Sequence, residues 1–236
     1  MQIIILAAGL GSRLGKGLPK ALVPVCGKAM LQYQYEWTRN FDPERTIVIG
    51  GYHFPEMKEF CSEHFSDVTL IENTRYKEQN LYSLLAAEGS FDKDTLIMNV
   101  DHIYPGSFAK RVRSEFGKVK NYAIFADTCR KLTDDDMKVF VNEGKVEKIS
   151  KKLTTWNAGY IGMSFIKKDF WANYRAAAAK TAENAKEKAV VEMVIQQLID
   201  DGFQPSIINS DDMTWYEIDT PQELEYAESE LKKSSD

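Results

Sequence analysis

The order of apolar and polar residues along the first half of the chain predicts strands that alternate with helices. Residues 2–8 form a nearly continuous apolar run that ends at a glycine-rich turn, which is typical of a strand buried on both faces of a parallel sheet. Further strands are expected at residues 45–50, 67–72, 95–100, 121–126, 138–141, 145–149 and 159–166, and helices at residues 29–41, 55–65, 80–90 and 106–117. This alternation predicts an α/β fold with a doubly wound, mostly parallel, Rossmann-like sheet.

The second half of the chain departs from strict alternation. Strand patterns crowd together between residues 121 and 166, where Asn142-Glu143-Gly144 forms a hairpin-type turn, so we expect a small β-rich insertion that covers the substrate site. Apolar residues at helical spacing follow at 191–199, and Thr220 with Glu223 forms a capping box for the final helix. The sequence contains no internal repeat or low-complexity linker, so one domain is expected over residues 1–236.

The composition narrows the function mainly by exclusion. A net charge of −5 provides no basic surface for nucleic acid, although a small anionic ligand needs only a local cluster of positive charge. No apolar run approaches the roughly 18 residues of a membrane span, and the amino-terminal run lacks the features of a signal peptide, so a cytoplasmic location is expected. The three cysteines are far apart, which suggests neither a disulfide framework nor a zinc site.

The most informative segment is the turn after the first predicted strand. It reads Leu6-Ala7-Ala8-Gly9-Leu10-Gly11-Ser12-Arg13-Leu14, and it closes with Pro19-Lys20. Glycines allow backbone N–H groups to approach phosphates, while Arg13 and Lys20 add charge-assisted contacts. A dinucleotide fingerprint needs glycine in place of Leu14, and a Walker loop needs a Gly-Lys-Ser/Thr ending that is absent. The turn therefore predicts a triphosphate site, against the alternative of a tight turn with solvated cations.

Two aspartates occupy equivalent places in the predicted fold. Asp101 follows the strand at 95–100, and Asp219 follows a short β-type run at 215–218. The carboxyl ends of strands are the ligand-binding edge of an open α/β sheet, so the two side chains can converge there. Magnesium prefers hard oxygen ligands and takes one or two carboxylates together with water and substrate phosphate. The pair predicts a Mg²⁺ site, against the alternative that both residues only cap turns.

The strand, the Ala-Ala-Gly-x-Gly-x-Arg-Leu turn and the Pro-Lys pair together resemble the signature of the sugar-nucleotidyltransferase superfamily. Within it the chain is most similar to the cytidylyltransferases that activate inositol-1-phosphate, phosphocholine or phosphonates, through Gly50-Gly51-Tyr52 and the segments at 80–84 and 101–104. The resemblance extends over residues 3–227. The loop between Arg13 and Pro19 is shorter than in the hexose-1-phosphate enzymes, which weakens a direct carry-over of sugar specificity and leaves the substrate open.

The resemblance assigns a role to each matching residue. It implies catalytic roles for Arg13 and Lys20 and metal ligation by Asp101 and Asp219. It implies nucleotide contacts from Leu6, Ala7, Ala8, Gly9, Gly11, Gly51, Asn80 and Ser83, although for Asn80 and Ser83 a helix N-cap and an exposed hydroxyl are equally good readings. It implies substrate contacts from Asn157, Gly159, Glu192 and one lysine among Lys148, Lys151 and Lys152. Trp156, Tyr160 or Trp215 would offer cation–π faces to a choline-like group, against simple packing in the core.

The implied reaction needs little beyond position and charge neutralisation. A phosphate monoester has a second pKa near about 6, so at neutral pH it is largely a dianion and needs no general base. It would attack the α-phosphorus of CTP in line with the departing pyrophosphate, while Mg²⁺, Arg13 and Lys20 offset the growing charge. His102, next to Asp101, is assigned a supporting role beside the metal ligands.

Other functions remain open at this stage. A uridylyl- or other nucleotidyltransferase acting on a sugar-1-phosphate would keep the phosphate argument and change only base and acceptor. A GT-A glycosyltransferase also places an acid at a strand end, but the glycine-rich and Pro-Lys elements argue against it. A non-catalytic nucleotide-sensing domain is a third class. The sequence leaves the nucleobase, the acceptor and the oligomeric state undecided, a homodimer included.

Overall fold

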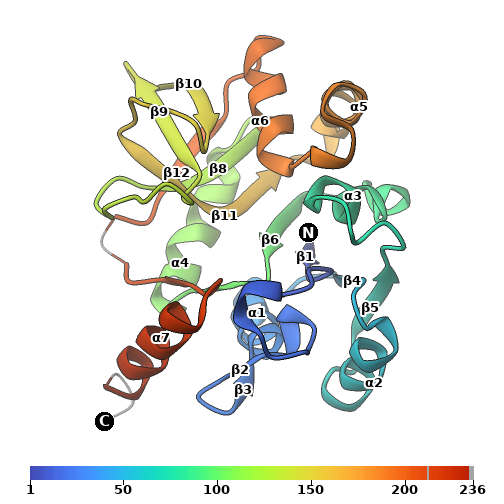
Figure 1. Cartoon of the computed structure of the whole chain (residues 1–236). Coiled ribbons are helices and arrows are strands. Elements are labelled where there is room, and N and C mark those ends of the chain that lie inside the picture. The colour runs from blue at the N-terminus through green and yellow to red at the C-terminus, as the bar shows by residue number, and fades with distance from the viewer. Residues whose placement is uncertain (212, 234–236) are drawn as a thin grey trace.

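The parallel sheet predicted from the apolar runs is present in the computed structural model, which describes residues 1–211 and 213–233 (Figure 1). β1 (Gln2–Leu6) lies between β4 (Arg45–Gly50) and β6 (Thr95–Asn99), and β5 (Val68–Glu72) pairs with the outer side of β4. These four strands are parallel, so their carboxyl ends lie at one edge of the sheet. The prediction of a mostly parallel α/β sheet is confirmed.

The rest of the sheet is built around β11 (Ala158–Ile166), which runs antiparallel to β6. Its other side pairs with β8 (Tyr122–Asp127), and β12 (Ser206–Asn209) pairs with β8. β9 (Lys138–Asn142) and β10 (Lys145–Ser150) form the expected hairpin.

The hairpin pairs only with the start of β11, through Ala158 and Gly159, whereas β6 pairs with residues 163–166 of β11. The hairpin therefore lies beyond the carboxyl end of β6 and extends the main sheet instead of forming a separate layer. The sequence pattern did not predict β12, because only Ile207 and Ile208 mark it as a strand.

Helices cover both faces of the sheet, as a doubly wound fold requires. α1 (Met30–Thr38), α2 (Phe54–His64) and α4 (Gly106–Glu115) pack on the face that receives Ile3 and Ile5 of β1. The opposite face receives Ile4 and Leu6 and is covered by α3 (Asn80–Leu85), α5 (Trp171–Ala185) and α6 (Val191–Asp200). The unbroken apolar run of β1 is thus explained by burial on both sides.

Two short antiparallel ribbons and the last helix complete the described chain. The ribbons pair β2 (Pro24–Val25) with β3 (Lys28–Ala29) and β7 (His102–Ile103) with β13 (Tyr216–Glu217). α7 (Pro221–Lys233) packs against them through Leu224 and Ala227, next to Leu14 of the glycine-rich turn. The predicted capping box is present, since the Glu223 carboxylate accepts from the Thr220 N–H and the Thr220 hydroxyl accepts from the Glu223 N–H. Among the described helices, none has the length and apolar character needed to span a membrane.

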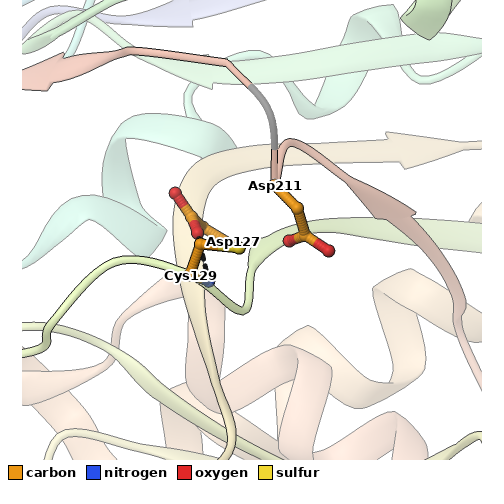
Figure 2. Close-up of side chains that lie close together, drawn as sticks. All are labelled: Asp127, Cys129 and Asp211. Atoms are coloured by element: carbon orange, nitrogen blue, oxygen red, sulfur yellow. Dashed lines mark hydrogen bonds between the residues drawn. The ribbon is translucent and has the colours of Figure 1, made fainter.

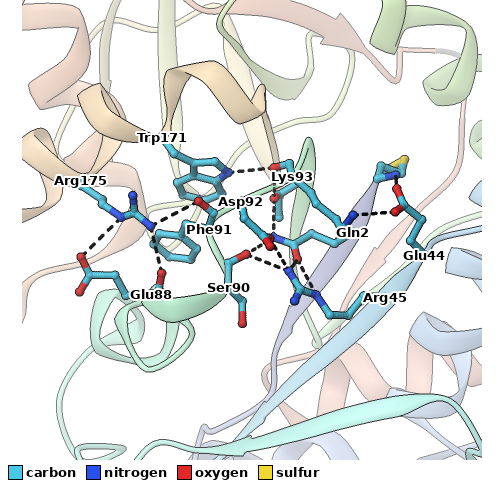
Figure 3. A network of polar contacts seen from close by, with 12 residues as sticks. Gln2, Glu44, Arg45, Glu88, Ser90, Phe91, Asp92, Lys93, Trp171 and Arg175 are labelled. Atoms are coloured by element: carbon cyan, nitrogen blue, oxygen red, sulfur yellow. Dashed lines mark hydrogen bonds and ion pairs between the residues drawn. The ribbon is translucent and has the colours of Figure 1, made fainter.

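A polar network closes the amino-terminal edge of the parallel strands (Figure 3). The Gln2 side chain accepts from Arg45 and donates to the Ser90 carbonyl at 2.6 Å, and Arg45 also donates to that carbonyl and to Asp92. The helix expected over residues 80–90 is shorter than expected: it ends at Leu85, and a separate 3-10 turn, Glu88–Ser90, presents the Ser90 carbonyl to this network. The opposite, carboxyl-terminal edge carries the candidate site.

Candidate active site

The glycine-rich turn folds back so that Lys20 packs directly against it. Gly11 has a φ of 63°, and a Cβ at this position would approach the Cβ of Lys20 to 3.1 Å. The Lys20 N–H donates to the Gly9 carbonyl, and buried Leu14 anchors the turn in the core beneath α7. Glycine is therefore required at position 11 both by the left-handed backbone and by the close passage of Lys20.

Asp101 and Asp219 converge on the ammonium group of Lys20. Lys20 is only 8% exposed, and its Nζ lies 2.5 Å from Oδ2 of Asp101 and also contacts Oδ1 of Asp219. The ribbon of β7 and β13 brings the two aspartates together, because the Ile218 N–H donates to the Asp101 carbonyl at 2.9 Å. One cation thus bridges two carboxylates that are remote in sequence.

The charges of this cluster shift each other's pKa values. Burial alone would lower the pKa of Lys20, but the charges of Asp101 and Asp219 outweigh it and the pKa is raised. Burial alone would raise the pKa of Asp101, but Lys20 and a hydrogen bond from His102 outweigh it and the pKa is lowered. Lys20 stays a cation and Asp101 an anion at neutral pH.

Arg13 joins the same cluster from the glycine-rich turn. Its Nη2 lies 2.5 Å from Oδ2 of Asp219, and its Nη1 lies 3.4 Å from Oδ2 of Asp135 in the connection between β8 and β9. Half of the Arg13 side chain is exposed, so it remains accessible to an anionic ligand. The structure therefore brings the predicted residues Arg13, Lys20, Asp101 and Asp219 into one place.

A cavity of about 430 Å³ opens beside this cluster. Among the residues predicted for the nucleotide, those that line it are Leu6, Ala8, Gly9, Gly11, Asn80 and Ser83. Ala7 is buried in the core behind the turn and does not line it. Gly51 also lies behind the wall, where an added Cβ would approach the Tyr76 Cβ to 2.5 Å and the Ala8 Cβ to 2.9 Å. Ala7 and Gly51 can shape the cavity only from behind.

Asn80 and Ser83 lie in α3, and the side chain of each forms a hydrogen bond with a residue outside this helix. The Asn80 Oδ1 accepts from the Val191 N–H at the start of α6 at 3.0 Å, and Gln79 occupies the N-cap position, so the N-cap reading of Asn80 is wrong. The Ser83 hydroxyl accepts from the Asn73 side chain at 3.0 Å, and Ser83 is buried instead of exposed. Both side chains are fixed where they meet the cavity.

The residues predicted for the substrate lie on the hairpin side and do not line this cavity. Both polar atoms of the Asn157 side chain pair with the backbone of Val141, and Gly159 makes room for Leu132. Lys148 lines a separate cavity between the hairpin and the α5 and α6 helices. The substrate role of these residues stays a prediction.

Glu192 lies in the first turn of α6 and is buried. Burial raises the pKa of Glu192, and the negative charges of Asp101 and Glu217 raise it further. The positive charge of Lys151 opposes the shift. Among the three candidate lysines, Lys151 is thus the one that interacts with Glu192. Lys152 is exposed and donates its backbone N–H to the Ser150 hydroxyl.

The proposed aromatic contacts are only in part available to a ligand. Trp215 already stacks on His102 and lies under the Arg130 guanidinium, which is 4.3 Å from the ring centre. Tyr160 is buried, and its hydroxyl pairs with that of Ser164 at 3.0 Å. Trp156 is 41% exposed on the hairpin side, with the Lys138 ammonium 5.2 Å from its ring.

The sequence reasoning missed Glu217 and Tyr76. Glu217 is a half-buried acid whose pKa is raised by partial burial and by Asp101 and Asp219, while His102 and Lys20 oppose the shift. It could have been found from its spacing, since residues 217 and 219 of an extended segment point to the same side. Tyr76 lines the cavity from an irregular segment, for which the sequence carried no signal.

A second acidic cluster lies at the end of β8 (Figure 2). Candidate ligand atoms of Asp127, Cys129 and Asp211 lie within 4.8 Å of one another. Asp127 already accepts from two backbone N–H groups and from the Trp215 indole, and Asp211 accepts from the Thr128 N–H. These hydrogen bonds give the cluster a structural role, which is to fix the connection that follows β8.

The fold and the site define a class of protein. A cationic glycine-rich turn, a cavity beside it and two carboxylates at the carboxyl edge of a parallel sheet can hold a nucleoside triphosphate with a divalent cation. Comparison with known families agrees, because residues 3–153 match the MobA-like NTP transferase domain. The chain belongs to this family of nucleotidyltransferases, and the predicted class of enzyme is confirmed.

Individual relatives cover more of the chain. A bifunctional IPC transferase and DIPP synthase of Thermococcus kodakarensis is 28% identical over 240 residues, which is 99% of this chain and 51% of the relative. The choline-phosphate cytidylyltransferase of Streptococcus pneumoniae is 28% identical over 168 residues, 67% of this chain and 71% of that protein. This chain spans about half the length of the bifunctional relatives it matches.

The fold is also shared with a solved structure. The inositol-1-phosphate CTP transferase of T. maritima superposes with a TM-score of 0.81 over 98% of this chain and 96% of that protein, at 19% identity. This likeness bears on the arrangement of helices and strands. The resemblance inferred from the motifs is confirmed at the level of the family and the fold.

Proposed function

We propose that the chain is a CTP-dependent cytidylyltransferase that activates a small phosphorylated alcohol or phosphonate and releases pyrophosphate. The observation that carries the proposal is the shared contact of Lys20 with Asp101 and Asp219, next to a glycine-rich turn in one cavity. The names of the relatives, a choline-phosphate cytidylyltransferase and an IPC transferase, support the choice of CTP and of this acceptor class.

Asp101 and Asp219 are the residues that would hold Mg²⁺. Their carboxylates already share one cation, the Lys20 ammonium, and hard carboxylate oxygens are the ligands that Mg²⁺ prefers. The ion would offset negative charge on the triphosphate during transfer. We treat the chain as one catalytic unit, because Asp219 near its end pairs with Arg13 and Lys20 near its beginning.

The residues of the chain then act by position and charge. A phosphate oxygen of the acceptor forms a bond to the α-phosphorus of CTP, and the bond from this phosphorus to the bridging oxygen of pyrophosphate breaks. Arg13 and Lys20 offset the charge on the α-phosphate and on the departing pyrophosphate. Lys20 keeps its proton, because its pKa is raised by the two aspartates despite its burial, so it serves as a fixed cation and not as a base.

If Glu192 faces the acceptor, as the resemblance implies, a substrate with a positive charge suits it best. Glu192 is buried, and Glu217 and Asp101 act on it electrostatically, while the exposed Lys151 is the cation that opposes them. Uncompensated buried carboxylates are costly unless a cation or several donors pair with them. We therefore place phosphocholine or aminoethylphosphonate ahead of inositol-1-phosphate as acceptor.

A two-way panel tests the proposal. The purified chain is incubated with each of the four NTPs and Mg²⁺, with phosphocholine, aminoethylphosphonate, inositol-1-phosphate or a hexose-1-phosphate, and pyrophosphate release is measured. We expect release with CTP and the first two acceptors, abolished in Asp101→Asn. Release only with UTP and a hexose-1-phosphate would establish the sugar-1-phosphate alternative. UDP released from UDP-sugars without pyrophosphate would indicate a glycosyltransferase, and no turnover anywhere would favour a sensing domain.

A further inference from the structure

His102 is packed into a slot that fixes the direction of its ring. The residue is 3% exposed, and its ring stacks on Trp215 with an angle of 12° between the planes. Its backbone is held as well, because β7 pairs with Glu217 and the His102 carbonyl accepts from the buried side chain of Gln34. Burial, stacking and backbone pairing together restrict the position of the ring.

Gly162 of β11 forms another wall of the slot. It has a φ of 72°, and a Cβ at this position would come within 2.7 to 2.9 Å of three atoms of the His102 ring. It lies where the pairing of β11 with β8 shifts register, between Tyr160 and Ser164. The irregularity of β11 thus leaves space for the His102 ring at the position where an ordinary residue would displace it.

Nδ1 of the His102 ring lies 2.7 Å from Oδ1 of Asp101, which is its polar partner among the described residues. The other oxygen of that carboxylate, Oδ2, contacts Lys20. A carboxylate oxygen is an acceptor, so in this hydrogen bond Nδ1 of His102 is the donor. The hydrogen bond directs one oxygen of Asp101 toward His102 and leaves the other for a cation.

We propose that His102 is a positioning residue that orients the Asp101 carboxylate for a divalent cation, and that Gly162 and Trp215 hold His102 in place for this purpose. The inference rests on the proposed function, since it takes Asp101 as a metal ligand. Hydrogen-bond partners of metal-ligating carboxylates typically change metal affinity by about 10- to 100-fold when they are removed. A role as general base does not fit, because Nδ1 faces Asp101 and the ring is buried.

The test measures Mn²⁺ affinity instead of turnover, by the electron paramagnetic resonance of free Mn²⁺ in the presence of CTP and without acceptor. His102→Asn retains an N–H donor near the position of Nδ1, whereas His102→Leu removes it. We expect Mn²⁺ affinity within about threefold of wild type for the asparagine variant and a loss of about 10- to 100-fold for the leucine variant. His64→Leu, at an exposed histidine of α2, is the matched control.

A second pair of variants moves the ring without removing it. Gly162→Ala should lower Mn²⁺ affinity although His102 is intact, because the new Cβ displaces the ring. Gly144→Ala is its control, since Gly144 has a similar φ of 75° but nothing within 4 Å of an added Cβ. This pair remains informative if His102→Leu does not fold.

The outcomes separate the inference from the proposed function. If wild type binds no Mn²⁺ with CTP, or Asp101→Asn binds as well as wild type, the proposed function fails. If Asp101→Asn loses Mn²⁺ while His102→Leu and Gly162→Ala bind like wild type, the inference alone is overturned. A lower melting temperature with unchanged Mn²⁺ affinity would also overturn it, because that is the result of a purely structural role.

Discussion

The ammonium of Lys20 lies 2.5 Å from Oδ2 of Asp101, and the same group contacts Asp219. Lys20 comes from the glycine-rich turn, while the aspartates come from the end of β6 and from the segment before α7. A divalent cation that binds the two carboxylates must therefore compete with a lysine that is already there. A triphosphate provides Lys20 with another anionic partner, so cation and nucleotide should assist each other.

The first prediction is that Mg²⁺ and CTP stabilise the protein synergistically. Mg²⁺ alone at 1 mM should change the melting temperature by less than about 2 °C. Mg²⁺ with CTP at a hundredfold excess over Kd should add about 2.7 kcal/mol, or roughly 5 to 10 °C for a chain of this size. Thermal unfolding followed by circular dichroism measures both, and chelation of Mg²⁺ with EDTA should reverse the effect.

Lys20→Met provides the control for this competition. Without the ammonium, Asp101 and Asp219 lose the cation that they share, while Asp219 keeps its ion pair with Arg13, so the variant should unfold about 1 to 3 kcal/mol more easily. It should bind Mn²⁺ alone at least about tenfold more tightly than wild type, while its affinity for CTP falls. If Lys20→Met binds Mn²⁺ alone no better than wild type, Lys20 does not compete with the metal.

The parts of the site that the sequence predicted are local or follow from strand order. The capping box of Thr220 and Glu223 depends on residues three apart, and it is present as expected. The sequence placed Asp101 and Asp219 together by assuming that both follow strands of the parallel sheet. Asp101 does follow β6, but Asp219 follows β13, whose antiparallel pairing with β7 is what brings it to Asp101. Such arguments need only the order of elements and no knowledge of side-chain packing.

The parts that could not be predicted depend on contacts between distant segments. Asn80 reads as a helix cap by itself, but its side chain binds the Val191 N–H across the molecule. The slot for His102 depends on Gly162, whose positive φ reflects a register shift between β11 and β8. Lys148 and Lys151 look alike in sequence, yet Lys148 lines a cavity beside α5 and α6, whereas the charge of Lys151 acts on the buried Glu192.

The second prediction concerns Arg13, whose ion pairs are exposed enough to contribute little to stability. Arg13→Lys retains the charge but loses the planar guanidinium, which can donate hydrogen bonds to two phosphate oxygens at once. The rate of pyrophosphate release should therefore fall about 10²- to 10³-fold. Its melting temperature should remain within about 4 °C of wild type, because exposed pairs are worth at most about 1 kcal/mol. Lys16→Ala on the same turn, which does not line the cavity, is the matched control and should retain activity.

The third prediction is a pH dependence of stability at Glu192. Its raised pKa means that the folded state favours the neutral acid. Below the ordinary pKa of 4.5, Glu192 therefore does not lower the free energy of unfolding, and this free energy falls as pH rises through the raised value. Glu192→Gln should therefore match wild type near pH 4.5 and become more stable toward pH 8, by about 1.4 kcal/mol for each unit of pKa shift.

Melting temperatures of the two proteins across this pH range isolate the contribution of Glu192. The charged neighbours that act on it, Lys151, Asp101 and Glu217, are present in both proteins. A constant difference from pH 4.5 to 8 would show that Glu192 keeps its ordinary pKa. The variant should also lose its preference for cationic acceptors if Glu192 faces them.

The last prediction concerns Gly51, which lies behind the nucleotide cavity where β4 ends. An added Cβ would approach the Cβ atoms of Tyr76 and Ala8 to 2.5 and 2.9 Å, and neither is the far end of a flexible side chain. Gly51→Ala should therefore cost about 1 to 3 kcal/mol and weaken CTP binding, since Tyr76 and Ala8 line the cavity. Gly117→Ala, with nothing within 4 Å of its Cβ, should change neither quantity. Urea unfolding and CTP titration calorimetry measure the two effects. Normal CTP affinity in Gly51→Ala would show that the cavity wall at Tyr76 and Ala8 does not contact the nucleotide.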